Sequence, residues 1–581
     1  MSAPKDSDRR IGVFICHCGG NISDYVDVEK VREAVAGEPG VVTAKTTMFA
    51  CSDAAQQEMI EAIGQEKLDG IVVASCSPKL HLFTFRAMAQ RAGLNPYRYI
   101  QANIREQCSW AHRGQIPEAT EKAASIVRAA IAKARASAPL STMRIETRPR
   151  VLVVGAGVAG LRAALALSDM GLTVYIAERE EKAGGWTAGF GKTFARDRSG
   201  SDMIQTLLRQ VAQRDNIMLY TRAELTQKTG SVGDFTVELS IAGQEEKVTL
   251  NVGAIVVATG VESYQPREGE FGWGLPGVVT LPQYKAMLDA GEELRLGDGR
   301  PVRSVAFIYC VGSRQGEEAQ SPHRYCSRFC CSAACHAAVV GAQRAAGLHQ
   351  VHLYRDMRTY GKYETLYEEA QRQGSAFLRW DPSEPPVVEL DEGRLLVRVK
   401  DHLLGGEELE IPADLVVLVT GMVPRENATL VNALKLPVGG DGFFNEIHPK
   451  LRPVETVVDG VFIAGAAQGP KTIAESVSSS LAAVSKSAAL LLKGYVDLEP
   501  FVAEVDESLC AWCGKCLEAC PYEAIEKVAA GGKEVARVIP SLCKGCGACA
   551  VPCEANAINV KGYTDEQVLG MIDALLKEAV G

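Results

Sequence analysis

Two cysteine runs near the end of the chain share one spacing. Residues 510–520 and 543–553 both follow the pattern C-x2-C-x2-C-x3-C. Three thiolates on one tight loop can hold three corners of a [4Fe–4S] cluster, and the fourth cysteine of such a run ligates the other cluster. The spacing therefore predicts two crossed ligand sets: Cys510, Cys513, Cys516 and Cys553 for one cluster, and Cys543, Cys546, Cys549 and Cys520 for the other.

Zinc is the alternative for these thiols, because C-x2-C pairs also suit a tetrahedral zinc site. Zinc takes only four ligands, so a duplicated run of four, the first followed by Pro521, favours clusters. Beyond the second run, Thr564 and Gln567 have the spacing of a capping box ahead of an apolar stretch. We expect an amphipathic helix there that packs on its own ferredoxin-like domain, with docking on a partner as the alternative.

A glycine turn follows an apolar stretch at residues 150–160. Gly155 permits a tight turn, Gly157 lets a pyrophosphate approach the backbone, and Gly160 lets helix and strand pack closely. A second apolar stretch ends in Glu178, an acid placed to bond ribose hydroxyls. Strand, turn, helix and acid occur in the order of a dinucleotide-binding lobe, and Gly185 is a further candidate contact.

The later strands favour FAD over NAD as this dinucleotide. One buried strand ends in Thr259-Gly260, and a second ends in Thr420-Gly421. Residues 459–475 return to the first lobe, and Gly465 and Gln468 there are placed to cap the flavin. These marks resemble the thioredoxin-reductase-like, two-dinucleotide-fold flavoproteins over residues 148–500. That resemblance implies an FAD lobe and an inserted second nucleotide lobe at about 300–450.

The second lobe departs from that pattern at its glycine turn. After the expected strand at residues 302–308, Cys310 stands where a GxGxxG motif would begin, so we do not expect bound NAD(P)H to be the direct electron donor. Four more cysteines follow, and we expect Cys326, Cys330, Cys331 and Cys335 on one helix surface. The interpretation is a [4Fe–4S] site made by Cys310, Cys326, Cys330 and Cys331, although which of the five thiols is spare stays open. Buried cysteines acting as small hydrophobes are the alternative.

Cysteines also follow each predicted strand of the N-terminal region. Apolar stretches at residues 11–15, 41–49, 70–74 and 97–103 alternate with helical ones, which predicts a small parallel α/β domain. Ligands of open parallel sheets bind beyond the carboxyl ends of the strands. We therefore expect a further [4Fe–4S] site from Cys16, Cys18, Cys51, Cys76 and Cys108, with Cys16 and Cys18 competing for position. A reactive thiol or persulfide site is the alternative.

Three kinds of domain are needed to position these residues. We expect an α/β multi-domain protein with a parallel α/β domain at 1–147, a thioredoxin-reductase-like FAD domain at 148–500, and an α+β two-cluster ferredoxin domain at 501–581. The 581 residues carry a net charge of −9 and 47% hydrophobic residues, which fits a globular chain and gives no indication of nucleic-acid binding. The sequence shows neither a secretory signal nor a membrane span. Eighteen cysteines without a signal indicate reduced thiols, so we expect a cytoplasmic protein.

The order of these motifs resembles the A subunit of heterodisulfide reductases over nearly the whole chain. The resemblance rests on Cys16-His-Cys18-Gly-Gly-Asn21, the glycine turn, Cys310-Val-Gly-Ser-Arg314, residues 325–331 and the double ferredoxin run. Family members often carry a ferredoxin insert in the FAD lobe, whereas residues 187–253 contain no cysteine here. The stretch 356–364 resembles a family segment near the flavin ring, which makes Lys362 a candidate to bond the ring and tune its half-reduced state.

The resemblance implies an oxidoreductase in which FAD takes two electrons and passes them singly to two branches, by bifurcation or its reverse. The implied partners are other heterodisulfide-reductase-like subunits, a hydrogenase- or dehydrogenase-linked input subunit, ferredoxin, and a second copy of the chain within a larger complex. A plain electron conduit in a sulfate-reduction or aromatic-CoA-reductase-type complex is one alternative. A cluster-bearing scaffold without enzymatic activity is the other.

Overall fold

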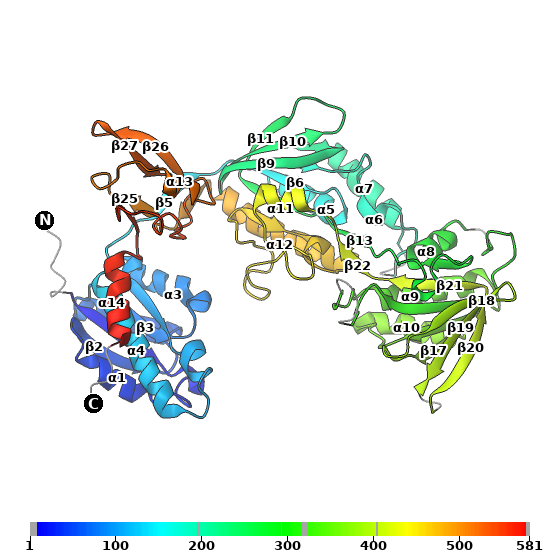
Figure 1. The fold of residues 1–581 in the computed structure, drawn as a ribbon, viewed down its shortest axis with the longest axis horizontal. Helices are drawn as coiled ribbons and strands as arrows, with labels where there is room; N and C mark the ends of the chain where they lie inside the picture. Colours follow the sequence, from blue (N-terminus) through cyan, green and yellow to red (C-terminus); the bar gives the residue numbers. More distant parts are fainter. Residues whose placement is uncertain (1–8, 195–197, 292, 317–322, 403–404, 577–581) are drawn as a thin grey trace. The chain divides into compact units, whose positions relative to one another are not determined.

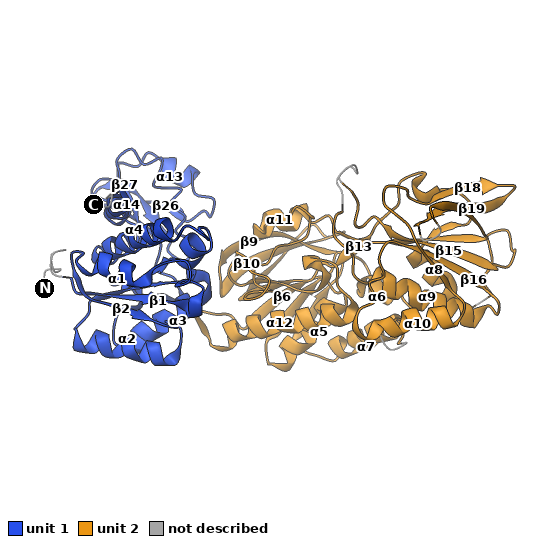
Figure 2. Ribbon diagram, turned by 90° about the horizontal axis from the view of Figure 1, so that it is seen from below, with its two compact units in different colours: residues 1–144, 497–581 blue, residues 145–496 orange. Residues whose placement is uncertain are grey.

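The chain forms two compact units, drawn in different colours in Figure 2. The computed structural model describes residues 9–194, 198–291, 293–316, 323–402 and 405–576. One unit joins Met1–Arg144 to Asp497–Gly581, and the other is Ile145–Val496. The N-terminal domain and the ferredoxin module therefore belong to one unit, and the flavoprotein region forms the other.

The N-terminal domain is a four-stranded parallel sheet in the order β2-β1-β3-β4. Its strands and main helices are β1 (Ile11–Cys16), α1 (Val28–Ala36), β2 (Val41–Thr47), α2 (Asp53–Gln65), β3 (Gly70–Ser75), α3 (Pro78–Arg91), β4 (Tyr99–Asn103) and α4 (Ile116–Arg135). The two central strands, β1 and β3, are buried along their whole length, as expected when helices cover both faces of a parallel sheet. The predicted parallel α/β domain is confirmed.

Side-chain caps start the helices close to the cysteines of this domain. The Ser52 hydroxyl accepts the backbone N–H of Ala55, and the Ser77 hydroxyl accepts that of Lys79. Both serines are N-caps, which satisfy N–H groups that have no partner within the helix. Cys51 and Cys76 each directly precede one of these caps. The same short loops that start α2 and α3 therefore carry the thiols at the carboxyl ends of β2 and β3.

The ferredoxin module consists of two small hairpin-like sheets and two helices. Its elements are β25 (Ala503–Val505), α13 (Lys515–Glu518), β26 (Ile525–Ala530), β27 (Lys533–Val538), β28 (Ile558–Val560) and α14 (Asp565–Leu576). Strand β25 pairs with β28 and β26 pairs with β27, both antiparallel. Six of the eight cysteines of the module pack in or against its small core. This arrangement agrees with the predicted α+β ferredoxin fold.

Helix α14 packs on α4 of the N-terminal domain, as Figure 1 shows, so the expectation that it packs on its own domain is wrong. The Gln567 side chain donates a hydrogen bond to the Ala136 carbonyl oxygen (3.2 Å). The Lys133 ammonium lies 3.4 Å from the centre of the Tyr563 ring. These contacts use the Lys133 side chain and the backbone carbonyl that ends α4, which the sequence of the module alone could not reveal.

The first lobe of the flavoprotein unit is built on a parallel sheet in the order β23-β12-β6-β7-β8. The strands are β6 (Arg150–Val154), β7 (Thr173–Ala177), β8 (Ile217–Tyr220), β12 (Ala254–Val257) and β23 (Val461–Ile463). The helices are α5 (Val158–Asp169), α6 (Gly185–Ala188), α7 (Gly200–Ala212), α11 (Ala428–Leu434) and α12 (Ile473–Leu492). An antiparallel sheet of β9 (Ala223–Ser231), β10 (Asp234–Ile241) and β11 (Val248–Val252) completes the lobe. Strand β23 (Val461–Ile463) follows β12 (Ala254–Val257) by just over 200 residues, because the second lobe is inserted between the two strands.

The second lobe repeats this plan with a parallel sheet in the order β14-β21-β15-β16-β17. The strands are β14 (Val278–Thr280), β15 (Ser304–Val311), β16 (His349–Tyr354), β17 (Ala376–Arg379) and β21 (Leu415–Thr420), and the helices are α8 (Leu281–Asp289), α9 (Cys330–Arg344) and α10 (Glu364–Arg372). Strands β18 (Val387–Asp391), β19 (Arg394–Asp401) and β20 (Glu407–Ala413) form its antiparallel sheet. An antiparallel pair, β13 (Val261–Ser263) and β22 (Met422–Pro424), carries the chain between the lobes. Two matching lobes confirm the predicted two-dinucleotide fold. Across the described ranges, no helix is both long and apolar enough to cross a membrane.

The packing of α4 leads to a prediction on pH. Burial lowers the pKa of Lys133 to about 8, whereas an unfolded lysine titrates near 10.4. Between these values the unfolded chain binds more protons, so stability rises with pH across that window. The measurement is amide hydrogen exchange of α14 in the full chain, with wild type and Lys133→Met compared at each pH. From pH 8 to pH 10, the opening free energy of α14 should rise in wild type by roughly 1–3 kcal/mol more than in the variant. Equal responses of wild type and variant would contradict the role of Lys133.

Candidate functional site

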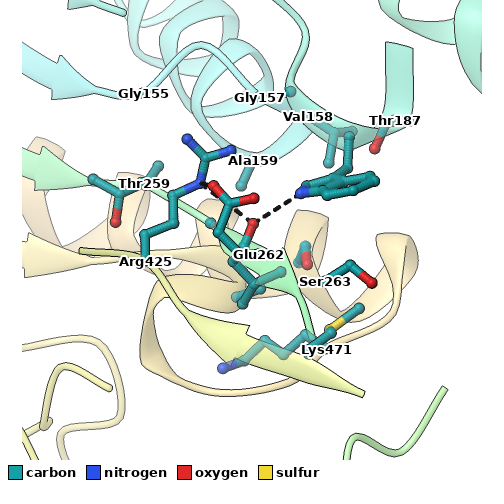
Figure 3. A pocket seen from close by; sticks show the side chains of 18 of the residues that line it. Gly155, Gly157, Val158, Ala159, Thr187, Thr259, Glu262, Ser263, Arg425 and Lys471 are labelled. Atoms are coloured by element: carbon teal, nitrogen blue, oxygen red, sulfur yellow. Dashed lines mark hydrogen bonds and ion pairs between the residues drawn. The ribbon is translucent and has the colours of Figure 1, made fainter. Parts of the chain in front are cut away.

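A cavity of about 530 Å³ opens beside the glycine turn of the first lobe, and Figure 3 shows part of its lining. It lies beyond the carboxyl ends of β6 and β7, where open parallel sheets bind their ligands. The structure places these predicted cofactor residues in its wall: Gly155, Gly157, Glu178, Gly185, Thr259 and Gly260. The cavity is large enough for a cofactor, since such sites usually measure about 300–1,000 Å³.

The three glycines of the turn are required for three different reasons. Gly155 has φ +105°, and a Cβ atom there would lie 2.5 Å from the Ala258 carbonyl oxygen. A Cβ atom at Gly160 would lie 1.9 Å from the carbonyl oxygen of Gly155, so α5 packs directly on the turn. Gly157 has open space where its Cβ would be, at the start of α5 and facing the cavity. A phosphate group can therefore approach the backbone at Gly157, as the predicted dinucleotide requires.

Glu178 braces the same turn. Its buried carboxylate accepts the backbone N–H groups of Ala156 (2.7 Å) and Glu180 (2.9 Å), and it lines the cavity. Near it, the buried Thr259 hydroxyl has no hydrogen-bond partner among the described residues. A buried polar atom without a partner costs free energy unless a ligand or water satisfies it. The open glycine and the unsatisfied hydroxyl fit a dinucleotide bound here.

Three predicted cofactor residues, all within the described part of the chain, do not line the cavity: Gly160, Gly465 and Gln468. The backbone N–H of Gly465 donates to the Ser479 hydroxyl, and a Cβ there would lie 2.7 Å from the Cβ of Ala159. The Gln468 amide donates to Glu446 Oε2 and to the Pro453 carbonyl oxygen, both at 2.7 Å. Gly465 thus allows close packing against α5. Gln468 accepts a hydrogen bond from Lys471, which lines the cavity.

Sequence reasoning missed several side chains of the cavity wall. Arg425 pairs with Glu262 at 3.0 Å and also donates to the Val261 carbonyl oxygen, as does the indole N–H of Trp186. Figure 3 shows Arg425, Thr259 and Glu262 beside the glycine turn. Arg425 lies more than 160 residues from Glu262, so only the pairing of β13 with β22 brings them together. Nothing in the local sequence indicates this.

Lys362 lies outside the cavity wall. It is exposed on the short helix η6 (Gly361–Tyr363), and its carbonyl oxygen accepts the Thr365 hydroxyl. The cavity wall contains three other lysines, Lys192, Lys285 and Lys471, of which Lys471 stands immediately before the N-cap of α12. The sequence analysis had assigned residues 459–475 to the flavin lobe. The position of Lys471 directly before Thr472, which caps a helix, could have indicated it as a cavity residue.

The middle cysteines surround the start of α9. Cys310 lies near the end of β15 with φ +65°, a left-handed conformation that normally favours glycine. Helix α9 begins at Cys330, so the expectation that Cys326 shares this helix is wrong. The reason is Arg328, whose φ of +64° interrupts the backbone, while its N–H donates to the Cys326 sulfur (3.3 Å).

Four of these thiols interact electrostatically with one another. Burial raises the pKa of Cys331 to about 12 and raises that of Cys330 well above its usual value, and charge on Cys310 and Cys326 raises both. Such mutual repulsion between thiolates is relieved when they share a cationic iron–sulfur core. Cys335 lies deeper, fully buried, with its sulfur 3.9 Å from the Tyr309 hydroxyl. The arrangement favours Cys335 as the spare thiol.

Helix α9 also forms part of the cavity wall. Phe329, at its N-cap, together with Ala333 and His336 lines the cavity. These residues are spaced by four and three, so they lie on one face of the helix. The thiols of Cys330 and Cys331 are held in the first turn of the same helix. One helix therefore joins the proposed cluster thiols to the cavity.

In the N-terminal domain, Cys16, Cys18, Cys51 and Cys76 are electrostatic neighbours. Burial raises the pKa of Cys16, and charge on Cys18 and Cys51 raises it further. Burial raises the pKa of Cys76 to about 11, with Cys16 and Cys18 adding to the shift. Backbone N–H groups of Cys18 and Ala50 donate to the Cys16 sulfur, both at 3.3 Å. These donors suit a thiolate ligand.

Cys108 is the fifth candidate thiol of this domain. It is fully buried in the domain core, on the π-helical segment η4 (Arg105–Ser109). Burial raises its pKa to about 11, and the nearby charge that opposes the shift comes from Lys122. Arg105, on the same segment, instead contacts the Cys18 sulfur at 3.5 Å. The segment after β4 thus brings an arginine into contact with one of the other thiols.

In the ferredoxin module, one small pocket contains the four thiols that the crossover rule assigns to the second cluster, Cys520, Cys543, Cys546 and Cys549. Backbone N–H groups donate to the sulfurs of Cys510, Cys520, Cys543 and Cys553 at 3.3–3.4 Å. N–H donors to sulfur are a normal feature of cluster loops. All eighteen cysteines are free of disulfides. Among the described residues, no three His, Cys, Asp or Glu side chains converge as the ligands of a single metal ion would.

Comparisons with known proteins identify families for two parts of the chain. The family described as 4Fe-4S dicluster domain matches residues 503–560, and the family described as Pyridine nucleotide-disulphide oxidoreductase matches residues 149–313. One of the two iron-sulfur A subunits of the CoB–CoM heterodisulfide reductase of Methanopyrus kandleri is 37% identical over 91% of this chain and 93% of its own length. This chain belongs to the family of heterodisulfide reductase A subunits. The A subunit of the H(2):CoB-CoM heterodisulfide,ferredoxin reductase of Methanothermobacter marburgensis is 36% identical, with 89% and 90% of the two chains covered.

Membership of this family confirms the predicted oxidoreductase with FAD and [4Fe–4S] clusters. Among solved structures, thioredoxin reductase of T. acidophilum is similar with 17% identity and a TM-score of 0.41, covering 59% of this chain and 97% of that one.

The open space at Gly157 leads to a prediction on FAD binding. Its φ of −76° is allowed for any residue, so Gly157→Ala should fold normally. The added methyl group would occupy the space that the pyrophosphate needs, and we expect roughly tenfold weaker FAD binding or more. The measurements are FAD per chain by absorbance and the dissociation constant by flavin fluorescence.

Gly189→Ala is the matched control. Gly189 ends α6, its Cβ would make an ordinary contact 3.6 Å from the Trp186 carbonyl oxygen, and it lies outside the cavity wall. FAD affinity should be unchanged in this variant. Equal affinity in Gly157→Ala and wild type would show that the pyrophosphate binds elsewhere.

Proposed function

We propose that this chain is the flavin-based electron-bifurcating component of a heterodisulfide-reductase-like complex. In this function, FAD accepts two electrons as a pair and passes one to a low-potential, ferredoxin-type branch and one to a higher-potential acceptor subunit. The reverse direction, confurcation, uses the same branches.

The observation that carries the proposal is the composition of the second lobe. In a nicotinamide-binding lobe, a glycine turn and the following helix N-terminus receive a pyrophosphate. Here Cys310 occupies the turn, and the helix begins with Cys330 and Cys331. The same helix lines the cavity of the first lobe. A cluster in place of a nicotinamide supports electron exchange with the flavin one electron at a time.

We propose four clusters for the chain. Two belong to the ferredoxin module with the crossed ligand sets, and a third uses Cys310, Cys326, Cys330 and Cys331. The fourth uses Cys16, Cys18, Cys51 and Cys76, which lie together, with Cys108 as the remaining candidate. Because α14 packs on α4, the N-terminal domain (1–147) and the ferredoxin domain (501–581) would act together as one cluster-bearing arm, and the FAD domain (148–500) would carry the flavin.

The names of the relatives indicate which partners this chain should have. Their names include ferredoxin, H2, formate and the CoB–CoM heterodisulfide as substrates of the whole reductases. We infer that this chain assembles with other heterodisulfide-reductase-like subunits and with a hydrogenase- or dehydrogenase-linked input subunit, and that it exchanges electrons with ferredoxin. We also propose that the chain forms a homodimer within such a complex and that the complex is located in the cytoplasm.

An anaerobic titration of the purified holoprotein tests the proposed function. NADH and NADPH should fail to reduce the flavin, whereas reduced ferredoxin should reduce it through the clusters. A bifurcating flavin takes up its electrons as a pair, so EPR should detect almost no stable flavin radical during the titration. A large stable radical would instead indicate the plain electron conduit. Rapid reduction by NAD(P)H would contradict both functions.

The third cluster can be tested by its thiols. Wild type should contain about sixteen iron atoms per FAD, and Cys330→Ala should lose about four of them. Cys335→Ala, which changes the next thiol along the same helix, should keep its full iron content. Iron and acid-labile sulfide analysis with EPR gives the readout. Equal iron loss in both variants, or in neither, would contradict the assignment of Cys330 as a ligand and Cys335 as the spare.

A further inference from the structure

Most cationic side chains in the wall of the flavin cavity have a carboxylate as partner. The cationic residues of the wall are Arg179, Lys192, Lys285, Arg425 and Lys471. Arg425 pairs with Glu262, Lys285 with Asp289, and Arg179 with Glu180. Such pairs leave little net charge to act on a ligand, because the two charges of each pair cancel at a distance.

Lys471 differs, because its hydrogen-bond acceptor is a neutral amide. Its ammonium donates to Gln468 Oε1 at 3.2 Å. The amide nitrogen of Gln468 donates in turn to Glu446 Oε2 and to the Pro453 carbonyl oxygen, both at 2.7 Å. The amide orientation is therefore set, and Gln468 presents its oxygen to the lysine. Glu446 holds Lys471 through an intervening amide rather than by direct contact.

The surroundings of Lys471 are poorly solvated and partly cationic. Burial lowers its pKa, Arg328 lowers it further, and Glu446 and Glu475 act in the opposite sense. The Glu475 carboxylate is itself bonded to Arg328 and accepts the Tyr360 hydroxyl at 2.9 Å. An ammonium in such a place is costly when no anion faces it. An anionic group in the cavity would offset that cost.

The start of α12 adds to this positive region. Thr472 caps the helix and forms a capping box with Glu475, and Thr472, Ile473 and Ser476 line the cavity. The helix has 20 residues, and its N-terminus carries a partial positive charge. Lys471 directly precedes this N-terminus. Both charges act on the same part of the cavity.

That part of the cavity is the one left for the flavin ring. Glu178 and the glycine turn belong to the adenosine and pyrophosphate portion of the dinucleotide. The walls supplied by α9 of the second lobe and by the first turn of α12 remain for the isoalloxazine. Two-electron reduction with uptake of one proton leaves that ring with a negative charge. A cation held nearby stabilises the reduced ring relative to the oxidised one.

We propose that Lys471 contacts the flavin ring and stabilises its reduced, anionic form, and that Gln468 and Glu446 are positioning residues that hold the ammonium in place. This assigns Gln468 a role through its neighbour, in place of the direct flavin contact predicted from the sequence. The inference concerns the flavin potential alone, so it is independent of whether the electrons are divided between two branches.

Sulfite provides a direct probe of this charge. Sulfite adds to the N5 atom of oxidised flavin and leaves the ring anionic, so its affinity reports how well the site stabilises negative charge. In the FAD-loaded full chain, Lys471→Met should bind sulfite at least about tenfold more weakly. A tenfold loss corresponds to a flavin midpoint potential about 30 mV lower for a two-electron couple. Lys471→Arg, which keeps the charge, should stay close to wild type.

Gln468→Leu tests the positioning role. This variant keeps Lys471 but removes the oxygen that holds it, so sulfite affinity should fall by less than in Lys471→Met. It also carries the test if Lys471→Met does not retain FAD. Lys486→Met is the control, because Lys486 lies on the same helix, half-exposed and paired with Glu455, outside the cavity wall.

Three outcomes would overturn the proposal. The first is an FAD-loaded Lys471→Met variant with the sulfite affinity and flavin midpoint potential of wild type. If Lys471→Met does not retain FAD, the same result in Gln468→Leu would overturn the proposal. The second is an equal loss in Lys486→Met, which would indicate a general charge effect. The third is a loss in Lys362→Met without one in Lys471→Met, which would return the role to the exposed lysine.

Discussion

The structure of the flavoprotein unit depends on the close packing of backbone against backbone at the glycine turn. Helix α5 reaches β6 and the end of β12 only because Gly155 and Gly160 have no side chains at the points of contact. This packing leaves the N–H groups at the start of α5 directed at open space beside Gly157. Glu178 then holds the turn through two backbone hydrogen bonds. The cavity exists because these atoms approach closely on one side and leave room on the other.

The second lobe has the same architecture with different residues at its turn. Its sheet and first helix match those of the FAD lobe, yet the turn between them carries Cys310, and the helix begins with two cysteines. Buried thiolates repel one another and are poorly solvated, which is why burial and neighbouring thiols raise the pKa values of Cys330 and Cys331. Metal binding removes this cost, since coordination favours the deprotonated thiol. The second lobe thus combines the geometry of a nucleotide-binding fold with a group of thiols, which is the basis of the third cluster that we propose.

Charge is balanced differently in the three groups of thiols and in the flavin cavity. The ferredoxin and N-terminal thiols accept hydrogen bonds from backbone N–H groups, which needs no charged side chain. Arginines also contact one thiol in the N-terminal group and one in the middle group, Arg105 at Cys18 and Arg314 at Cys310. In the flavin cavity, carboxylates balance most cations, and Lys471 is held by an amide instead. The difference agrees with the proposed ligands, because a cluster has thiolate ligands whereas the charge of a flavin ring changes on reduction.

The sequence alone determined the motifs whose residues lie close along the chain. The ferredoxin runs, the glycine turn with Glu178, and the alternation of strands and helices in the N-terminal domain were predictable, because local spacing sets both the turn geometry and the ligand positions. Only the tertiary structure decided which distant side chains meet. It brought Arg105 to the Cys18 sulfur, excluded Cys326 from α9, and put α14 on α4. It also put Lys471, rather than Lys362, in the cavity wall. These outcomes depend on the packing of segments far apart in the chain, and a one-residue change in backbone conformation, as at Arg328, is enough to redirect a side chain.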